Sequence, residues 1–401
     1  MSTTVNESMS QSMDAPRPTQ FQGFQRSRGR VGVRNHVAVI STVALCNRIA
    51  QLAAVRAGSP LVIEGDFQRG LQTEDAALQE AMLAQLLDHP NIGAALVLCH
   101  DRRTAQRWQQ QAAALGKPIE TLAVMDCQGV QNAIDTASAA IARLTLAAAQ
   151  ARRIPCSFSQ LTFALECGGS DASSAVCSNP AIGQFVDWVI SQGATVIVSE
   201  TAEFIGAEEV VKAQSVSAEV ADEINACIRV TEKRMAGDGD HYRGVNPTPE
   251  NIEAGLSTLI EKTMGAVCKI GNARFQGCLR FGEEPSQPGL YFMDTPFFSP
   301  CSITGMVAGG AQMTLFSMGV FNPSGNPLTP TLKVCGNPET VMHWEDGIDV
   351  NLSGLILGDI TLAQAADRIA HAVSITASGD ISKTEAWGEG QFIFPRFLPA
   401  F

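Results

Sequence analysis

The sequence predicts an α/β fold with two Rossmann-like, open and mostly parallel sheets, each flanked by helices. Two observations predict it. Short β-branched, apolar runs alternate with amphipathic segments from His36 onward, and this alternation restarts after residue 155. Strands separated by helical patterns of about 10–15 residues are typical of βαβ units in a parallel sheet. No G-x-G-x-x-G motif follows the first strand, so a dinucleotide is not implied.

The first half of the chain is predicted to form a smaller N-terminal α/β domain over residues 21–151. Its expected strands are 36–43, 61–64, 94–98 and 119–125, and its expected helices are 44–55, 74–87, 102–115 and 130–150. Residues 1–20 are rich in Ser, Thr and Gln, so we expect a disordered tail there. The run Arg152-Arg153-Ile154-Pro155 is expected to mark the domain boundary.

The second half, residues 155–401, is predicted to be a larger α/β domain that carries the catalytic site. The expected strands are 161–165, 194–199, 290–293, 313–316 and 331–334, and the expected helices are 218–235, 251–269, 362–375 and one beginning at Pro180. Asn179 suits the N-cap of that last helix, and proline is favoured at the first helical position. Residues 237–244 are expected to be a polar loop.

Composition narrows the classes of function. The 401 residues are 45% apolar and 17% charged, which is typical of a globular protein. The formal charge of −12 argues against a nucleic-acid partner, because such proteins normally present a basic surface. The electrostatic field of such an acidic protein would repel an anionic substrate, so a binding site for an anion needs a cation of its own.

Two further features bear on location. No apolar run is long enough for a transmembrane helix, so no membrane partner is expected. The 11 cysteines include no C-x-x-C pair, which disfavours a disulfide framework. A reducing, cytoplasmic location is therefore expected, with most cysteines as buried apolar fillers.

The segment Glu166-Cys167-Gly168-Gly169-Ser170-Asp171 lies between a predicted strand and a predicted helix. Ligands of open α/β sheets bind at the carboxyl ends of strands. Paired glycines let the backbone approach a ligand closely. Cys167 could ligate a metal, and Asp171 could ligate one or accept a proton. The plainer alternative is a tight turn with a buried cysteine.

Two carboxylates, Glu200 and Glu203, directly follow the strand predicted at 194–199. Carboxylates at the end of a strand suit acid–base chemistry or metal binding. An ordinary solvated loop is the alternative interpretation.

The predicted helix 251–269 has an unusual face. Polar and small residues recur along it at spacings of 4, 3, 4, 3 and 4, which predicts that they share one side. These residues are Asn251, Gly255, Thr258, Lys262, Gly265 and Lys269. Glycine on a solvent face costs about 1 kcal/mol relative to alanine. We therefore expect a polar interior face whose lysines meet an acidic substrate, with a solvated outer face as the alternative.

Further polar loops end the later strands. Thr295 follows one strand, Thr304 and Gly305 lie on a short helix, and Lys333 lies on the last predicted strand. Several polar loops at strand ends of one α/β domain are what an active site requires.

These motifs resemble the altronate/galactarate dehydratase family, which includes the large subunit of (2R)-sulfolactate sulfo-lyase. The resemblance runs from about Gly23 to the C-terminus. The motifs that carry it are Gly29-Arg30-Val31-Gly32-Val33-Arg34-Asn35, Cys167-Gly168-Gly169-Ser170-Asp171, Asn179-Pro180, Ser199-Glu200-Thr201, Asn246-Pro247, Glu261-Lys262, Met293-Asp294-Thr295-Pro296 and Thr304-Gly305-Met306-Val307-Ala308-Gly309-Gly310. Gly325-Asn326-Pro327 and Lys333 are closer to the sulfo-lyase member.

The resemblance implies a metal-assisted lyase that acts on a small anionic α-hydroxy acid. A base removes the proton α to the carboxylate, a β-substituent leaves as hydroxide or sulfite, and a 2-keto acid results. The developing dianion needs cations or a metal. The implied cofactor is a divalent metal, with Fe²⁺ first and Mn²⁺ or Mg²⁺ as alternatives.

The residues are assigned to roles on this basis. The expected catalytic residues are Lys262, Lys269, Glu203 and Asp171. The expected substrate-binding residues are Arg34, Asn35, Gly168, Gly169, Ser170, Asn251, Thr295, Thr304, Gly305 and Lys333. The candidate metal ligands are Cys167, Asp171, Glu200 and Glu203. For Arg34 and Asn35 the alternative role is bracing the domain interface.

The chain also departs from the family pattern. A His-x-x-Gly-Cys stretch is replaced by residues 64–70, and a Gly-Cys-Glu stretch by Cys99-His100-Asp101. An arginine between glycines is missing near residue 320. A non-catalytic ligand-binding or scaffold subunit of a lyase complex is therefore the alternative function.

Partners are expected as well. Single-chain members of the family carry a small domain before the large portion, whereas here 22 residues precede the resemblance. We therefore expect a separate small subunit and an oligomeric assembly.

Overall fold

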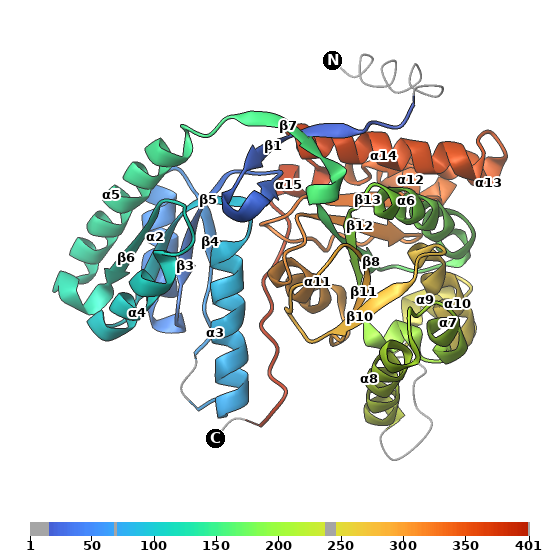
Figure 1. Ribbon diagram of the computed structural model, residues 1–401, viewed down its shortest axis with the longest axis horizontal. Helices are drawn as coiled ribbons and strands as arrows, with labels where there is room; N and C mark the ends of the chain where they lie inside the picture. The colour runs from blue at the N-terminus through green and yellow to red at the C-terminus, as the bar shows by residue number, and fades with distance from the viewer. Residues whose placement is uncertain (1–15, 68–69, 237–245, 400–401) are drawn as a thin grey trace.

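The computed structural model describes residues 16–67, 70–236 and 246–399. Two parallel sheets, each flanked by helices, lie side by side in it (Figure 1). The prediction of an α/β fold with two open parallel sheets is therefore confirmed. No helix among these residues is long and apolar enough to cross a membrane. The polar loop expected at 237–244 lies outside the described residues.

The smaller sheet has the strand order β4-β3-β5-β6, and all its strands are parallel. Its strands are β3 (His36–Ser41), β4 (Leu61–Ile63), β5 (Ile92–Cys99) and β6 (Ile119–Ala123). The helices α2 (Ala44–Arg56) and α5 (Val130–Ala148) cover one face, and α3 (Thr73–Asp88) and α4 (Arg102–Ala112) cover the other. Both faces are buried, so β5 is a continuous apolar run and does not alternate.

The larger sheet has the order β10-β11-β9-β8-β12-β13-β14 and is also parallel throughout. Its strands are β8 (Thr162–Cys167), β9 (Thr195–Val198), β10 (Phe275–Leu279), β11 (Gly289–Met293), β12 (Met313–Met318), β13 (Thr331–Cys335) and β14 (Val350–Asn351). The helices α6 (Asn179–Ser191) and α14 (Leu362–Ser378) pack on one face, and α11 (Ser299–Ala308) packs on the other. The chain leaves the central strand β8 toward β9 and later returns to its other side as β12. This arrangement makes the carboxyl end of β8 a switch point, where open sheets bind ligands.

A third, antiparallel sheet was not predicted. It consists of β1 (Gln20–Gln25), β2 (Val31–Gly32) and β7 (Arg153–Ser157), with β1 in the centre. The pairing of β1 with β7 joins the start of the described chain to the expected domain boundary. Phe21 is buried on one side of β1 while the flanking glutamines are exposed, so a period-2 signal was present in a glutamine-rich segment.

The helix expected at 251–269 is broken, and that prediction is wrong. The chain forms α9 (Pro249–Glu253), α10 (Leu259–Val267) and a 3₁₀ turn, η6 (Cys268–Ile270). Gly255 has a φ of +96°, which a continuing helix cannot accommodate. The Thr258 hydroxyl then caps α10 by accepting a hydrogen bond from the Glu261 N–H at 3.2 Å. A capping signal therefore overrides the helical spacing.

The remaining helices surround this core. They are α7 (Glu208–Ala213), α8 (Ala218–Ala236), α12 (Pro338–His343), α13 (Ser353–Leu357) and α15 (Lys383–Trp387). The 3₁₀ turn η5 (Thr201–Phe204) directly follows β9 and carries Glu203 into the molecule.

Candidate active site

A cavity of about 310 Å³ lies at the carboxyl ends of β8, β9 and β12. This is the edge that the strand order marks as a switch point. Of the residues predicted from the sequence, those that line it are Cys167, Gly168, Gly169, Glu200, Asn251 and Lys262. Its volume is within the range of pockets that hold small metabolites.

Cys167, Glu203 and Lys269 form a buried cluster beneath this cavity. Lys269 Nζ lies 2.6 Å from Glu203 Oε2 and 3.1 Å from Cys167 Sγ. The Cys167 thiol lies 2.9 Å from the same carboxylate oxygen. Glu203 and Lys269 each leave only 1% of the side chain exposed. Such an ion pair survives burial only because each charge has a partner.

The charges fix the protonation of this cluster. Burial by itself would raise the pKa of Glu203, but the ammonium groups of Lys269 and Lys262 lower it below its ordinary value. Burial would lower the pKa of Lys269, yet the surrounding Cys167 and Glu203 raise it above its ordinary value. Burial raises the pKa of the Cys167 thiol. These pKa directions favour a Glu203 carboxylate paired with the Lys269 ammonium.

Lys262 connects the cluster to the cavity. Its Nζ lies 3.9 Å from Glu203 Oε1 and donates a hydrogen bond of 2.8 Å to Asn246 Oδ1. Asn246 in turn donates to the Ala202 carbonyl at 3.1 Å. The ammonium also lies 4.9 Å from the centre of the Phe297 ring. Lys262 therefore presents a positioned cation at the cavity wall.

Glu200 and Glu166 form a second buried acidic pair. Burial and the neighbouring carboxylates raise the pKa of Glu200, and burial raises the pKa of Glu166 to about 7. Glu200 Oε2 and Glu166 Oε1 are buried and have no hydrogen-bond donor. A proton shared between the two carboxyls would satisfy both oxygens, and a cation at Glu200 would satisfy one of them.

Cys167, Glu200 and Glu203 could together hold a metal ion. One ligand atom from each lies within 4.8 Å of the others, and all three residues are buried. A thiolate with two carboxylates suits a borderline divalent metal such as Fe²⁺ or Zn²⁺. The unpartnered oxygen of Glu200 fits this interpretation. Three of the four predicted ligands are thus brought together.

Asp171, the fourth predicted ligand, is held elsewhere. It accepts hydrogen bonds from the Ser174 N–H and the Asn337 side chain, both at 2.8 Å. It therefore braces the loop after β8. The neighbouring Ser170 contributes its carbonyl, which accepts a hydrogen bond from Asn251 Nδ2 at 3.0 Å.

Several predicted residues lie behind the cavity wall. The Thr295 hydroxyl accepts a hydrogen bond of 2.9 Å from the Glu200 N–H and so positions that carboxylate. Lys333 lies over the Phe316 ring at 3.4 Å from its centre and donates to the carbonyl of Ser324, which lines the cavity. Burial lowers the pKa of Lys333 to about 7.

Four other predicted residues are not brought to the cavity. Thr304 Oγ donates to the Pro300 carbonyl at 2.7 Å within α11. Gly305 is packed against the Phe281 ring, where a Cβ would come within 2.9 Å of a ring carbon. Arg34 and Asn35 lie at the junction of the two sheets. There Arg34 binds Glu385 of the C-terminal region, as in the bracing alternative, whereas Asn35 donates to the Ala148 carbonyl of α5 within the smaller domain at 2.8 Å.

Sequence reasoning did not assign Glu166, Asn246 or Ser302. Ser302 Oγ donates to Glu166 and lies 2.7 Å from Ser199 Oγ. A charged residue inside an apolar strand was a usable signal for Glu166, because burying an unneeded carboxylate is costly. Asn246 stood only in the Asn246-Pro247 motif of the family resemblance, which assigned it no role.

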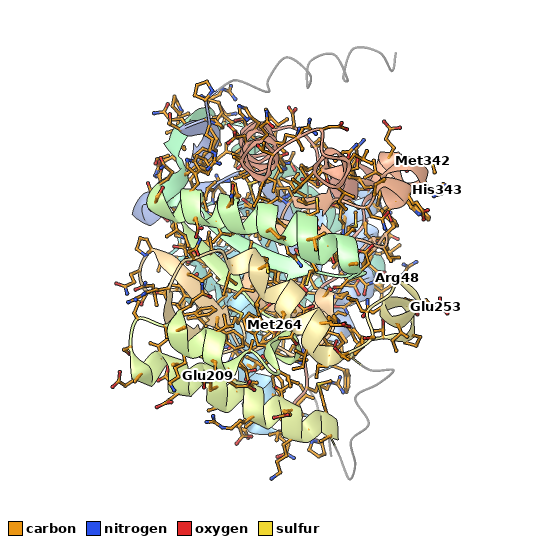
Figure 2. The ribbon with its side chains drawn as sticks, turned by 90° about the vertical axis from the view of Figure 1, so that its right-hand side faces the viewer. Arg48, Glu209, Glu253, Met264, Met342 and His343 are labelled. Atoms are coloured by element: carbon orange, nitrogen blue, oxygen red, sulfur yellow. The ribbon has the colours of Figure 1, made fainter. Side chains whose placement is uncertain are left out.

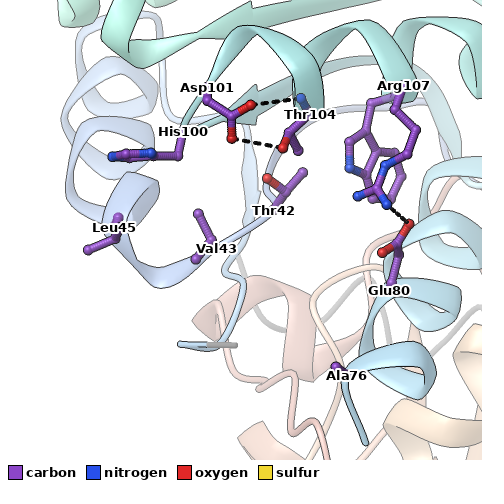
Figure 3. A pocket seen from close by; sticks show the side chains of 10 residues that line it. Thr42, Val43, Leu45, Ala76, Glu80, His100, Asp101, Thr104 and Arg107 are labelled. Carbon is purple, nitrogen blue, oxygen red and sulfur yellow. Dashed lines mark hydrogen bonds and ion pairs between the residues drawn. The ribbon is translucent and has the colours of Figure 1, made fainter. Parts of the chain in front are cut away.

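A second cavity, of about 330 Å³, lies at the carboxyl ends of β3 and β5 (Figure 3). Its charged groups are already paired. Asp101 accepts hydrogen bonds from the Thr104 N–H and hydroxyl, and Arg107 lies 3.0 Å from Glu80. No unpartnered buried polar atom among the described residues lines it. The cavity beside β8 is therefore the better candidate.

Comparisons with known proteins cover both halves of the chain. Residues 158–399 match the family model of the D-galactarate/altronate dehydratase C-terminal domain. Residues 23–149 match that of the D-galactarate dehydratase/altronate hydrolase second domain.

Individual relatives cover most of the chain. The (2R)-sulfolactate sulfo-lyase subunit beta of Chromohalobacter salexigens is 32% identical over 381 residues, which span 94% of this chain and 97% of the relative. The altronate dehydratase of Bacillus subtilis is 28% identical over 91% of this chain and 75% of its own. The altronate dehydratase of Escherichia coli is 29% identical over 84% of this chain and 70% of its own.

Proposed function

Because the chain belongs to the D-galactarate/altronate dehydratase family, whose named members here are lyases and dehydratases, we propose that it is a lyase acting on a small α-hydroxy acid. The reaction is a β-elimination. The α-proton is removed, a substituent leaves from the β-carbon, and the enol product becomes a 2-keto acid. The buried Lys262, Lys269 and Glu203 beside an open cavity are the observation that carries this proposal.

The two lysines have different roles because their exposure to the cavity differs. Lys262 lines the cavity, so its ammonium can meet the substrate carboxylate; to act as the base that takes the α-proton, its Nζ must first lose a proton. Lys269 is paired with Glu203 beneath the cavity wall and stays charged. Its fixed positive charge favours the negative charge that develops on the substrate. Gly168 and Gly169 leave room for the substrate to approach the backbone.

Cys167, Glu200 and Glu203 would hold a divalent metal, for which Fe²⁺ is our first expectation. A bound divalent cation supplies Lewis-acid stabilisation of an enolate-type dianion. The Thr295 hydroxyl positions Glu200 through its backbone N–H. Cys167 ends β8, and Glu200 and Glu203 lie at the start of and within η5, which follows β9, so the three donors come from two neighbouring strand ends.

The test is turnover with defined metals. The protein is stripped with a chelator and then supplied anaerobically with Fe²⁺, Mn²⁺ or Mg²⁺. Galactarate, altronate and sulfolactate are offered, and 2-keto acid and sulfite are measured separately. Release of sulfite identifies a carbon–sulfur lyase, and keto acid without sulfite identifies a hydro-lyase. Full activity of the stripped protein would contradict metal assistance.

Variants locate the metal independently of turnover. We expect Cys167→Ala and Glu200→Gln to lose bound metal, measured by elemental analysis after dialysis. Asp171→Asn is the matched control, because Asp171 lies outside the three-residue cluster. No keto acid from any substrate, with metal bound, would instead support a non-catalytic ligand-binding or scaffold subunit.

We also propose that the chain works with a separate small subunit in an oligomer. A relative named as a subunit beta supports this. Exposed apolar side chains on one face also support it, because such patches mark interaction sites. Met264 and Met342 lie on that face in Figure 2. Ile260, one helical turn before Met264, is also exposed, as is Val176 on a segment that packs against α10.

A further inference from the structure

Cys227 and Cys278 bring two thiols together outside the candidate active site. Cys227 lies on α8 and Cys278 on the edge strand β10, and their Sγ atoms are 3.8 Å apart. Both side chains are half-buried, so small reagents can reach them. The two sulfurs already face one another, so a disulfide requires them to approach from 3.8 Å to about 2.05 Å.

The surroundings give the two thiols different reactivity. The hydrogen bond from Cys278 lowers the pKa of Cys227. The neighbouring carboxylates of Asp294 and Glu223 oppose this, because negative charge disfavours a thiolate. Cys227 is thus the better nucleophile of the pair and Cys278 the better resolving thiol.

We propose that Cys227 and Cys278 form an oxidisable dithiol that hydrogen peroxide converts to a disulfide. The Cys227 thiolate attacks the peroxide oxygen and breaks the O–O bond, giving a sulfenic acid and hydroxide. Cys278 then attacks the sulfenic sulfur and expels the second oxygen as hydroxide. Two electrons pass from the thiols to the peroxide, and the two thiol protons leave with its oxygens as water.

This bond would link the ends of the segment that carries the site lysines. The two cysteines are 51 positions apart, and Lys262 and Lys269 lie between them. The helix α8 also packs against η5, which holds Glu203. Closing a loop of this length restricts the unfolded chain. Oxidation should therefore raise the Tm by several degrees and stiffen the segment behind the cavity.

The experiment treats the reduced full chain with a slight excess of hydrogen peroxide. We expect a mass loss of two hydrogens, a cross-linked Cys227–Cys278 peptide in a non-reducing digest, a raised Tm, and reversal of all three by dithiothreitol. In Cys278→Ser, Cys227 should accumulate as a sulfenic acid that dimedone traps.

Cys268→Ser is the matched control, because Cys268 is the exposed cysteine and donates to the Met264 carbonyl. This variant should form the same cross-link as the unmodified sequence. Free thiols at Cys227 and Cys278 after oxidation, or a cross-link through any other cysteine, would overturn the proposal. These readouts do not depend on turnover, so they stand apart from the proposed lyase activity.

Discussion

Lys262 and Lys269 are both buried next to Glu203, yet only Lys262 reaches the cavity. Two lysines face the Glu203 carboxylate, and the buried carboxyls of Glu166 and Glu200 lie beside them. Taking such charges out of water is costly, and well-packed apolar residues would often be as stable. The free-energy cost of burying these lysines is understandable if a substrate anion binds beside them.

We predict that Lys262→Met lowers kcat at least 100-fold while the protein stays folded. The ammonium that meets the substrate is lost, but Glu203 keeps its close partner Lys269 at 2.6 Å. Steady-state kinetics and the Tm check this. Lys212→Met, which removes an exposed lysine from α7, is the control and should leave both unchanged. An unaltered kcat in Lys262→Met would refute the role of this lysine.

Arg34 is the clearest case of a residue whose role differs from the first expectation. Its guanidinium makes two contacts with Glu385, at 2.6 and 2.8 Å, and donates to the Thr376 and Asp380 carbonyls. These partners lie on and after α14, far along the chain. Arg34 therefore ties the start of the smaller sheet to the C-terminal helices.

We predict that Arg34→Met lowers the free energy of unfolding by about 3 kcal/mol, because it leaves a mostly buried carboxylate without its partner. Burial would raise the pKa of Glu385, but the bonds from Arg34 lower it below its ordinary value of 4.5. The stability from this pair is thus present above that pH and lost as pH falls below it. The variant should lose less stability on acidification.

Urea unfolding at several pH values measures both the loss in free energy of unfolding and its dependence on pH. Arg56→Met is the control, because the Arg56–Asp135 pair is half-exposed and should contribute less than about 1 kcal/mol. An equal loss in free energy of unfolding in Arg34→Met and Arg56→Met would mean that Arg34 does not brace the junction of the two sheets.

At the scale of elements, the loops after β8 and β12 are interlocked. The Gly169 carbonyl accepts hydrogen bonds from the Gly319 and Val320 N–H groups, at 3.1 and 2.7 Å. Gly169 has a φ of +65°, and a Cβ there would come within 2.1 Å of the Val320 carbonyl oxygen. This contact fixes one wall of the cavity, since both loops line it.

We predict that Gly169→Ala raises KM and lowers the Tm, because the added methyl pushes the Val320 loop away. The Gly58→Ala variant separates the steric contact with Val320 from the backbone cost of a side chain at positive φ. Gly58 has a φ of +89° but open space around it, so it carries only the backbone cost of about 1–2 kcal/mol. A Tm loss no larger than that of Gly58→Ala, with KM unchanged, would show that the close approach is unimportant.

At the scale of the whole molecule, the two parallel sheets share a core. The helix α3 of the smaller sheet packs against α11 of the larger one, and their apolar side chains belong to one buried cluster. The antiparallel pairing of β1 with β7 adds a second connection. The two halves are therefore joined through a shared core, and the face shown in Figure 2 carries the exposed Met264 and Met342.

We predict that a small second chain, of roughly 100 residues, co-purifies with this protein from its native host. Met264→Lys should weaken that association, because it places a charge in the apolar patch around Ile260. Leu146→Lys, on the exposed side of α5, is the control and should retain the partner. A fully active protein recovered alone would refute the prediction.

Much of the fold could be predicted from local signals. The apolar runs at 94–98 and 313–316 are strands because they are buried on both faces. The glutamine-rich β1 and the break at Gly255 were missed. In these cases long-range pairing and a capping box outweighed composition and spacing.

The candidate site was predicted in part. Cys167, Glu200, Glu203, Lys262 and Lys269 come together as their places at strand ends and their polarity suggested. Thr304 and Gly305 do not: the Thr304 hydroxyl bonds a carbonyl within its own helix, and Gly305 packs against the Phe281 ring. The assigned roles of all these residues stay predictions until turnover is measured.

The sequence by itself determined the α/β class, the parallel sheets and the edge where the polar loops gather. These depend on periodicity and on residues close together in the chain. Only the tertiary structure decided which charges meet. Lys269 forms an ion pair with Glu203, and Arg34 forms one with Glu385. The Cys227 thiol faces that of Cys278. Such pairings depend on how separate elements pack, and no local pattern in the chain encodes that packing.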